Sequence, residues 1–456
     1  MPRIITIETP SLGDRTYLVH DGRKAFVVDP QRDIDRVTEA ATQAGVTITH
    51  VFETHIHNDY VTGGLALARA TGASYHVNAE DSVSFERTPI RAGETVAVSE
   101  SLTVRAIATP GHTFTHLSYA LEEDGENVGV FTGGSLLFGT TGRPDLLGPE
   151  HTDALVRHQY ASAHRLADEL PDDASVLPTH GFGSFCSAGS GGGGDSSTIG
   201  AEKKANAALT DTEEAWVADV LAALEDYPAY YVHMGAANAG GPEAPDLSEP
   251  RRVDKEAIAR SLEAGEWVID LRTRTAYAAG HVRGSLNIGL DGQFSTYLGW
   301  LIPWGTPLTL LGESAEQVAD AQRELVRIGI DELQGSATGG PRDWSEGAPG
   351  AYERATFADL EQVRHHRKVA VLDVRRASEH AASHIEDAVN IPIHQLLERL
   401  DEAPSGETWV HCASGYRASI AASVLAADGR HVVLVDDDFD QHVKDAALPV
   451  VEDARV

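Results

Sequence analysis

The sequence of 456 residues contains only two cysteines, Cys186 and Cys412, which lie far apart along the chain. Two thiols in so long a chain do not build a disulfide framework, which is typical of a protein from a reducing compartment. No run of 18 apolar residues occurs, so we expect no helix that spans a bilayer. The first residues also lack the apolar core of a secretory signal. Together these absences predict a cytoplasmic protein that has no membrane partner.

Positive charge is also scarce. Asp and Glu outnumber Lys and Arg by 69 to 36, which gives a formal net charge of −33 at pH 7. A surface of this sign repels phosphate backbones and anionic headgroups, so the composition argues against a nucleic-acid partner and against an anionic membrane surface. The balance is typical of an acidic proteome adapted to high salt. The 42% of apolar residues is ordinary for folded domains, and the length predicts two to four of them.

A six-residue loop in the last part of the chain is the most informative feature that is present. It reads Cys412-Ala413-Ser414-Gly415-Tyr416-Arg417. An apolar strand precedes the loop and a helix-forming run, 418–427, follows it. A thiol between a strand and a helix N-terminus faces backbone N–H donors, and the helix dipole and Arg417 add positive potential that favours the thiolate. The pattern therefore predicts that Cys412 is a nucleophile.

An internal repeat surrounds this loop. Three short motifs recur at a constant offset of 103 residues. The pairs are 268–272 with 371–375, 280–282 with 383–385, and 287–288 with 390–391. A constant offset over separate motifs indicates two copies of one α/β domain of roughly 100 residues, of which only the second has the cysteine loop.

The second copy resembles the rhodanese (sulfurtransferase) family. An Asp after a strand, a His eleven residues later, an Asn-Ile-Pro turn and a Cys loop follow in the family's order. The resemblance implies that Cys412 carries sulfane sulfur as a persulfide, and that Arg417 and the loop around Ser414 and Gly415 bind the substrate anion. The loop is one residue shorter than that of cysteine phosphatases, which favours sulfur transfer. The first copy has neither Cys nor Arg after its strand 308–311, which implies an inactive domain.

A metal-binding pattern lies in the first part of the chain. His55, His57 and Asp59 stand at alternate positions after the strand 50–52, so that their side chains point to one side of an extended backbone. His112 follows further on, in a Pro-Gly turn. Imidazole and carboxylate groups suit Fe²⁺ or Zn²⁺. We therefore expect one metal ion with ligands drawn from these four residues.

This order of motifs resembles the metallo-β-lactamase fold over about residues 1–240. Tyr60 stands where the family has its last motif histidine. The change removes a principal ligand of a second metal and disfavours a binuclear hydrolase. The resemblance thus implies an αββα sandwich that holds a single ion.

Gly134 is a second departure, because it replaces the aspartate of the family's FTGD motif. The mononuclear iron enzymes of this fold bind Fe²⁺ with two histidines, matched here by His55 and His112, and with that aspartate. Three alternatives remain for this chain: His57 completes a three-histidine set, Asp59 rotates in, or the metal binds weakly. Fe²⁺ is expected from the resemblance, with Zn²⁺ as the alternative.

The segment 180–186 resembles the HGxGSxC segment of persulfide dioxygenases fused to rhodanese domains. Those fusions have the same order of a metallo-β-lactamase domain, an inactive rhodanese and an active rhodanese. The resemblance implies that Cys186 holds or orients a persulfide near the metal and that His180 lines the substrate pocket.

The expected fold class is therefore a multidomain α/β protein, in which a metallo-β-lactamase αββα sandwich precedes two α/β rhodanese-like domains. The expected domains are 1–245, 252–340 and 352–456. Two stretches rich in Gly, Ala and Pro, 235–250 and 336–350, are the expected linkers between them.

Three functions remain as hypotheses. In the first, O₂ oxidises a small-molecule thiol persulfide at one Fe²⁺ to give sulfite and the thiol, and Cys412 passes sulfane sulfur to that sulfite. In the second, only the sulfurtransferase works and the N-terminal domain is a binding module. The third is a zinc hydrolase of thioesters that uses His55, His57 and His112. The thiol carrier and the oligomeric state, a homo-oligomer included, are open.

Overall fold

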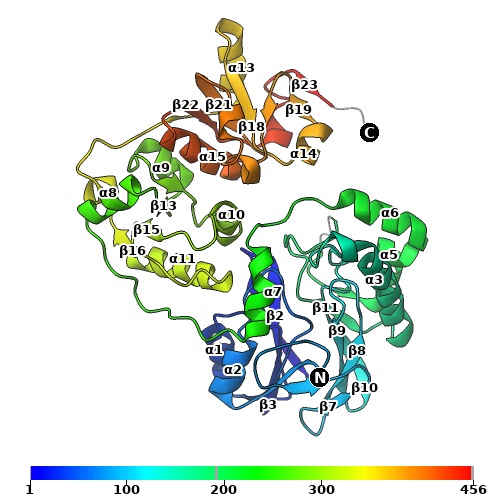
Figure 1. Cartoon of the computed structure of the whole chain (residues 1–456). Coiled ribbons are helices and arrows are strands. Elements are labelled where there is room, and N and C mark those ends of the chain that lie inside the picture. The colour runs from blue at the N-terminus through cyan, green and yellow to red at the C-terminus, as the bar shows by residue number, and fades with distance from the viewer. Residues whose placement is uncertain (1, 190–193, 453–456) are drawn as a thin grey trace. The chain divides into compact units, whose positions relative to one another are not determined.

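The computed structural model describes residues 2–189 and 194–452. The chain divides into two compact units, each with its own hydrophobic clusters (Figure 1). The units are Met1–Asp246 with Leu325–Gly329, and Leu247–Glu324 with Ile330–Val456. Within the described residues, no helix is both long enough and apolar enough to cross a membrane.

The first unit is built on two six-stranded sheets. The first has the strand order β1-β2-β3-β4-β5-β6, with β1 (Arg3–Thr9), β2 (Asp14–His20), β3 (Lys24–Val28), β4 (Thr47–Phe52), β5 (Ser74–Asn78) and β6 (Thr88–Ile90). The second has the order β12-β11-β10-β9-β8-β7, with β7 (Thr95–Ala97), β8 (Leu102–Ala108), β9 (Leu117–Glu123), β10 (Glu126–Gly133), β11 (Ser175–Pro178) and β12 (Ser197–Thr198). The helices are α1 (Asp35–Ala44), α2 (Gly64–Thr71), α3 (Pro149–Glu169), α4 (Ile199–Ala205), α5 (Ala207–Thr210), α6 (Glu213–Ala223) and α7 (Tyr231–Gly240).

The two sheets pack face to face through an aromatic core. Phe26 of β3 meets Phe131 of β10 edge-on, with ring centroids 5.8 Å apart, and Phe52 of β4 lies 5.1 Å from Tyr119 of β9. Because side chains alternate along a strand, each sheet also has an outer apolar face. Helices α1 and α2 cover that face of the first sheet, and α3 and α6 cover that of the second. The result is a four-layer αββα sandwich.

The loops that carry the histidines leave one edge of this sandwich. The strands β4, β8 and β11 end shortly before His55, His112 and His180, respectively. Strands β8 and β10 are both antiparallel to β9, and β11 is parallel to β10. The carboxyl ends of β8, β10 and β11 therefore lie at one edge of the second sheet. Residues distant in sequence therefore meet at that edge.

The second unit contains two open parallel sheets. The first part holds α8 (Lys255–Glu263), β13 (Trp267–Asp270), α9 (Arg274–Ala279), β14 (Leu286–Asn287), α10 (Phe294–Leu301), β15 (Leu308–Gly312), α11 (Ala315–Arg327), β16 (Gly335–Thr338) and α12 (Pro341–Trp344), with the strand order β14-β13-β15-β16. The second part holds β17 (Glu353–Ala355), α13 (Phe357–His366), β18 (Ala370–Asp373), α14 (Ala377–Ala382), β19 (His384–Ile385), β20 (Val389–Asn390), two 3₁₀ turns, η1 (Ile393–Gln395) and η2 (Leu400–Glu402), β21 (Glu407–His411), α15 (Tyr416–Ala427), β22 (His431–Val435), α16 (Phe439–His442) and β23 (Val450–Val451). Its main sheet has the order β17-β22-β21-β18-β20.

The repeat in the sequence has a counterpart in this unit. The pairs β13 and β18, α9 and α14, and β14 and β20 are each offset by 103 residues. Arg272 Nε donates to Asp270 Oδ1 at 2.9 Å, and Arg375 Nε donates to Asp373 Oδ1 at 3.0 Å. The two halves therefore share buried ion pairs as well as the order of their elements.

Both segments expected to be linkers contain some regular structure, and the boundary between the two compact units, at Asp246 and Leu247, lies within the first of them. Helix α7 extends into the first residues of 235–250, and 336–350 contains most of β16 and all of α12. Ser336 pairs with Leu310 of β15, and Pro341 stands in the first turn of α12. A proline is tolerated there because the first helical N–H groups have no partner within the helix. The Gly and Pro of this segment therefore accompany a strand end and a helix start.

Candidate functional site

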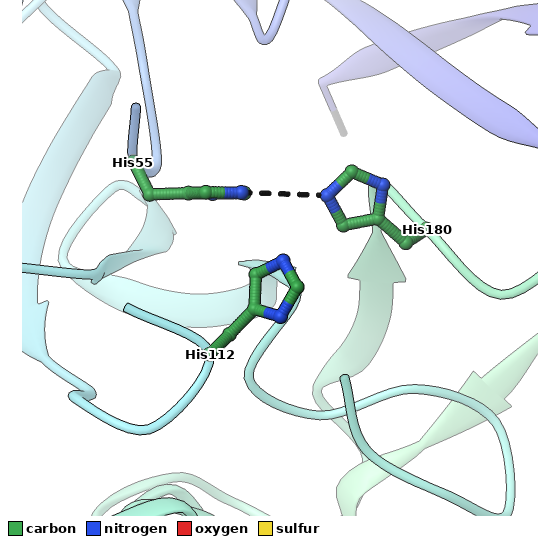
Figure 2. Close-up of side chains that lie close together, drawn as sticks. All are labelled: His55, His112 and His180. Carbon is green, nitrogen blue, oxygen red and sulfur yellow. Dashed lines mark hydrogen bonds between the residues drawn. The ribbon is translucent and has the colours of Figure 1, made fainter. Parts of the chain in front are cut away.

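Three buried histidines converge in the first unit. The ligand nitrogens of His55, His112 and His180 all lie within 4.8 Å of one another, and Figure 2 shows the three rings close together. The His55 Nε2 and His180 Nε2 atoms are 3.4 Å apart. Each side chain is at most 1% exposed. Three imidazole nitrogens that face one point away from solvent form a donor set for a metal ion.

Hydrogen bonds behind two of the rings fix which nitrogen carries the proton. His112 Nδ1 lies 2.8 Å from the Arg143 carbonyl, which only accepts, so Nδ1 is protonated and Nε2 has a free lone pair. The Thr54 hydroxyl donates to Asp29 and so accepts from His55 Nδ1, at 2.9 Å. No group in the described part of the chain hydrogen-bonds to His112 Nε2. The lone pair of His112 Nε2 is therefore free for a cation, and that of His55 Nε2 points to the same place, with His180 Nε2 as its one neighbour at 3.4 Å among the described residues.

His180 is held by two carboxylates. Its Nδ1 lies 2.9 Å from Asp14 Oδ1 and 3.1 Å from Asp59 Oδ2. Burial alone would lower the pKa of His180, but Asp59 and Asp14 outweigh it and raise the pKa well above its ordinary value. A carboxylate behind an imidazole fixes the ring and makes its far nitrogen a better metal ligand. His180 therefore presents Nε2 to the cluster.

Gly134 gives His112 the space for this position. A Cβ on Gly134 would lie 2.4 Å from His112 Cδ2 and 2.9 Å from its Nε2. Gly142 confines the ring as well, because a Cβ there would lie 2.8 Å from His112 Nδ1. The imidazole thus occupies the space that a side chain at position 134 requires. This position of His112 and the family's aspartate at position 134 exclude each other.

The two other predicted ligands lie beside this cluster. His57 directs Nε2 to Glu53 Oε2, at 3.1 Å, and to Asp29 Oδ1, at 3.3 Å. Burial would lower the pKa of His57, but Asp29 and Glu53 raise it to about 9. Asp59 faces His180, and ligand atoms of His57, Asp59 and His180 also lie within 4.8 Å of one another. The structure therefore groups His55 and His112 with His180, while His57 and Asp59 form an adjoining group that shares His180.

Cys186 lies next to these residues as a buried thiol. Its Sγ is 4.0 Å from the Tyr231 hydroxyl, and its side chain is fully buried. Burial raises the pKa of Cys186 well above its ordinary value, and Asp59 raises it further. The Arg143 N–H donates to the Cys186 carbonyl at 2.7 Å, which ties this segment to the loop behind His112. Cys186 is therefore a neutral thiol beside the histidines.

Three acids behind the cluster escaped the sequence patterns: Asp14, Asp29 and Glu53. Asp29 and Glu53 directly follow β3 and β4, two parallel neighbours whose ends lie at the same edge. Acidic residues directly after two neighbouring parallel strands could therefore have been predicted to lie together at this edge. Asp14 begins β2, and nothing in its local sequence marks it.

The cysteine loop of the second unit lies between β21 and α15. Cys412 is 2% exposed, whereas Ser414 lies exposed on the loop. Gly415 precedes α15 with φ of 88°, a left-handed conformation that favours glycine. A Cβ on Gly415 would lie 2.3 Å from Asp436 Oδ1, so a larger residue is also excluded by space. The loop conformation therefore depends on Gly415.

Arg417 forms a bidentate ion pair with Glu379. Its two terminal nitrogens donate to the Glu379 carboxylate oxygens at 2.5 and 2.8 Å. Burial would raise the pKa of Glu379, but Arg417 outweighs it and lowers that pKa. Arg417, predicted to bind the substrate anion, is thus already paired with a carboxylate at the edge of the loop.

Comparisons with known proteins match the two stretches of the chain that contain these sites. Residues 15–181 match the model of the metallo-beta-lactamase superfamily. Residues 356–445 match that of the rhodanese-like domain. The chain contains a metallo-beta-lactamase domain and a rhodanese-like domain. The first holds the histidine cluster and the second holds the Cys412 loop.

Individual relatives match parts of the chain. A hydroxyacylglutathione hydrolase from Polaromonas sp. is 29% identical over 35% of this chain and 58% of its own length. An atrochrysone carboxyl ACP thioesterase from Aspergillus terreus is 34% identical over 30% of this chain and 42% of its own length. The chain thus spans about half the length of these curated relatives. The crystal structure of a metallo-beta-lactamase from Staphylococcus aureus subsp. aureus COL is 26% identical with a TM-score of 0.66, and the match covers 74% of this chain and 99% of that one.

Proposed function

We propose that this chain oxidises a small-molecule thiol persulfide with O₂ in its metallo-beta-lactamase domain and carries sulfane sulfur on Cys412 in its rhodanese-like domain. The observation that carries the proposal is the histidine cluster with the neutral thiol of Cys186 beside it, in one chain with a loop cysteine at a helix N-terminus. A buried S–H donates a hydrogen bond to an anionic persulfide without repelling it. Both domains then act on sulfane sulfur.

The two reactions balance as a sequence. One persulfide RSSH, one O₂ and one water give one thiol RSH, one sulfite and two protons, and the outer sulfur loses the four electrons that O₂ gains. The Cys412 thiolate takes the outer sulfur of a second RSSH, which leaves as RSH, and the cysteine persulfide then passes that sulfur to sulfite. The S–S bond of the cysteine persulfide breaks, the S–S bond of thiosulfate forms, and the Cys412 thiolate is released. The product of the first domain is thus the acceptor for the second.

The residues fit one Fe²⁺ ion. His55 and His112 present the lone pairs of their Nε2 atoms, and His180 presents its Nε2 in front of two carboxylates. Fe²⁺ in this place would supply the redox chemistry that lets O₂ react with a persulfide. Asp14 and Asp59 hold His180 in orientation, and burial of all three rings keeps bulk water from the reacting groups.

Oxygen uptake by the full-length protein tests this proposal. Protein loaded with Fe²⁺ should consume one O₂ per sulfite formed from glutathione persulfide, and His112→Ala should reduce uptake to the level without protein. His151→Ala is the control, because His151 is an exposed histidine of the same domain. Uptake that is equal in the wild type and in His112→Ala would rule the oxidation out.

A zinc hydrolase of thioesters is the second candidate. The all-nitrogen donor set favours it, because three histidines and a water form a catalytic zinc site and Gly134 offers no carboxylate. Relatives named as a hydroxyacylglutathione hydrolase and an ACP thioesterase support it. Zn²⁺ in this place would make bound water acidic enough to attack a thioester. Cleavage of S-lactoylglutathione without O₂, at a rate that Zn²⁺ restores after chelation, would favour this candidate over the oxidation.

The sulfurtransferase half has its own test. Transfer from thiosulfate to cyanide should be lost in Cys412→Ser and retained in Cys186→Ser. We also propose that the first repeat is an inactive rhodanese-like copy, because β15 leads into Glu313 and Ser314 without a thiol. Transfer that survives in Cys412→Ser would contradict both assignments.

A further inference from the structure

Tyr416, in the cysteine loop, reaches out of the second repeat into the first. It is the first residue of α15, and its hydroxyl donates to the Gly289 carbonyl at 2.7 Å. Its ring lies over Gly292, where a Cβ would come within 2.4 to 2.6 Å of three ring atoms. The ring of Tyr297, also in the first repeat, lies 5.9 Å from that of Tyr416. The first repeat therefore has a site shaped for this side chain.

Two further contacts fix the surroundings of the loop to the first repeat. The Asn287 N–H donates to the Ser423 hydroxyl on α15 at 3.0 Å. Arg274 Nε donates to Asp436 Oδ1 at 2.6 Å, and this carboxylate packs directly against Gly415. The C-terminal end of the loop and the body of α15 are thus held from outside the repeat that carries the thiol.

These contacts act on the groups that surround Cys412. The first N–H groups of a helix have no acceptor within it, and in α15 they follow directly on the cysteine loop. Their direction depends on how the first turn is held, and Tyr416 is the residue that holds it. The Cys412 thiolate must attack in line with the S–S bond of the sulfur donor, so a small displacement of the loop slows the reaction.

We propose that Tyr416 is a positioning residue for sulfur transfer, and that the first repeat anchors the cysteine loop through it. This inference rests on the proposed transfer through Cys412. It gives the copy without a thiol a defined task, which is to hold the N-terminal turn of α15 in place.

The test compares two substitutions in the full-length protein with one control. Tyr416→Phe removes the hydroxyl and keeps the ring, and Gly292→Ala displaces the ring without changing any residue of the loop. Tyr277→Phe is the control, because the Tyr277 hydroxyl also donates to a backbone carbonyl in the first repeat, that of Ser285. We expect kcat for thiosulfate:cyanide transfer to fall about fivefold to tenfold in the first two variants, with KM for thiosulfate within about twofold of the wild type. Tyr277→Phe should keep the wild-type kcat.

Hydrogen–deuterium exchange provides a readout that does not require sulfur transfer. Exchange in the peptide 412–418 should be faster in Tyr416→Phe than in the wild type, and unchanged in Tyr277→Phe. Faster exchange in a protein that never transfers sulfur would support the anchor and overturn the proposed transfer. Wild-type kcat and wild-type exchange in Tyr416→Phe would overturn the anchor, as would an equal fall of kcat in Tyr277→Phe.

Discussion

Replacement of Gly134 by alanine should weaken metal binding by the first domain. The added Cβ would lie 2.4, 2.6 and 2.9 Å from three ring atoms of His112, whereas carbon atoms in contact are normally about 3.5–4.0 Å apart. The ring has little freedom to yield. The Arg143 carbonyl accepts a hydrogen bond from its Nδ1 at 2.8 Å, and the backbone at Gly142 lies close to the same Nδ1.

The geometry sets the size of the effect. Relief of the contact needs a displacement of about 1 Å, which is half of a typical Zn–N or Fe–N bond of about 2.0–2.1 Å. We therefore expect metal affinity to fall about 10- to 100-fold, the usual cost of a disturbed ligand environment. Overpacking should also lower the free energy of unfolding of the metal-free protein by about 1–3 kcal/mol. Gly134→Asp should behave in the same way and should not restore the family's metal site.

Competition with a chromophoric chelator measures the affinity, and urea unfolding measures the stability. Gly129→Ala is the matched control, because Gly129 lies in β10, the strand that ends directly before Gly134, and its nearest neighbour to an added Cβ is 3.2 Å away. A wild-type affinity in Gly134→Ala would refute the reasoning. So would a gain of affinity in Gly134→Asp.

Three further predictions follow from buried charges. Asp14→Asn should reduce metal affinity about 10- to 100-fold by removing the carboxylate behind His180, as a chelator titration would show. Burial lowers the pKa of His76 from its ordinary value of 6.5 to about 4. Below pH 6.5 the proton therefore binds the unfolded chain more tightly than the folded one, and the free energy of unfolding decreases as the pH falls. His76→Phe should therefore remove roughly 3 kcal/mol of the decrease in unfolding free energy between pH 7 and pH 4. Glu379→Gln should cost about 1–2 kcal/mol at pH 7 by leaving Arg417 without its counter-ion, and because the pKa of Glu379 is lowered, the difference from the wild type should shrink as pH falls through that pKa.

Local patterns predicted the elements around both sites. Short apolar runs predicted strands at 50–52 and 308–311, which lie within β4 and β15. The offset of 103 residues predicted a repeated α/β unit, and the paired elements of the second unit follow that offset. These features depend on residues close in sequence or on a strict period, so a sequence carries them directly.

Contacts between distant residues were beyond such patterns. His180 meets His55 across 125 positions, because β4 and β11 end at one edge of the sandwich. The sequence placed His180 only near the substrate and left three alternatives for the third ligand, which were His57, Asp59 or weak binding of the metal. A glycine at position 134 could be read as the loss of a ligand, whereas its effect on His112 depends on where that ring lies in space.

The charge partner of Arg417 could not be predicted from the sequence either. Arg417 in a cysteine loop predicts an anion site, but the sequence does not indicate that Glu379 already occupies its guanidinium group. The predicted linker 235–250 does contain the boundary between the two compact units, whereas the Gly and Pro of 336–350 occur where a strand ends and a helix begins, in β16 and α12.

X-ray absorption spectroscopy of the iron-loaded protein tests the central claim most directly, because it counts the imidazoles bound to the metal. We expect three bound imidazoles in the wild type and in His57→Gln, and two in His180→Gln. Loss of an imidazole in His57→Gln, with three retained in His180→Gln, would contradict the central claim.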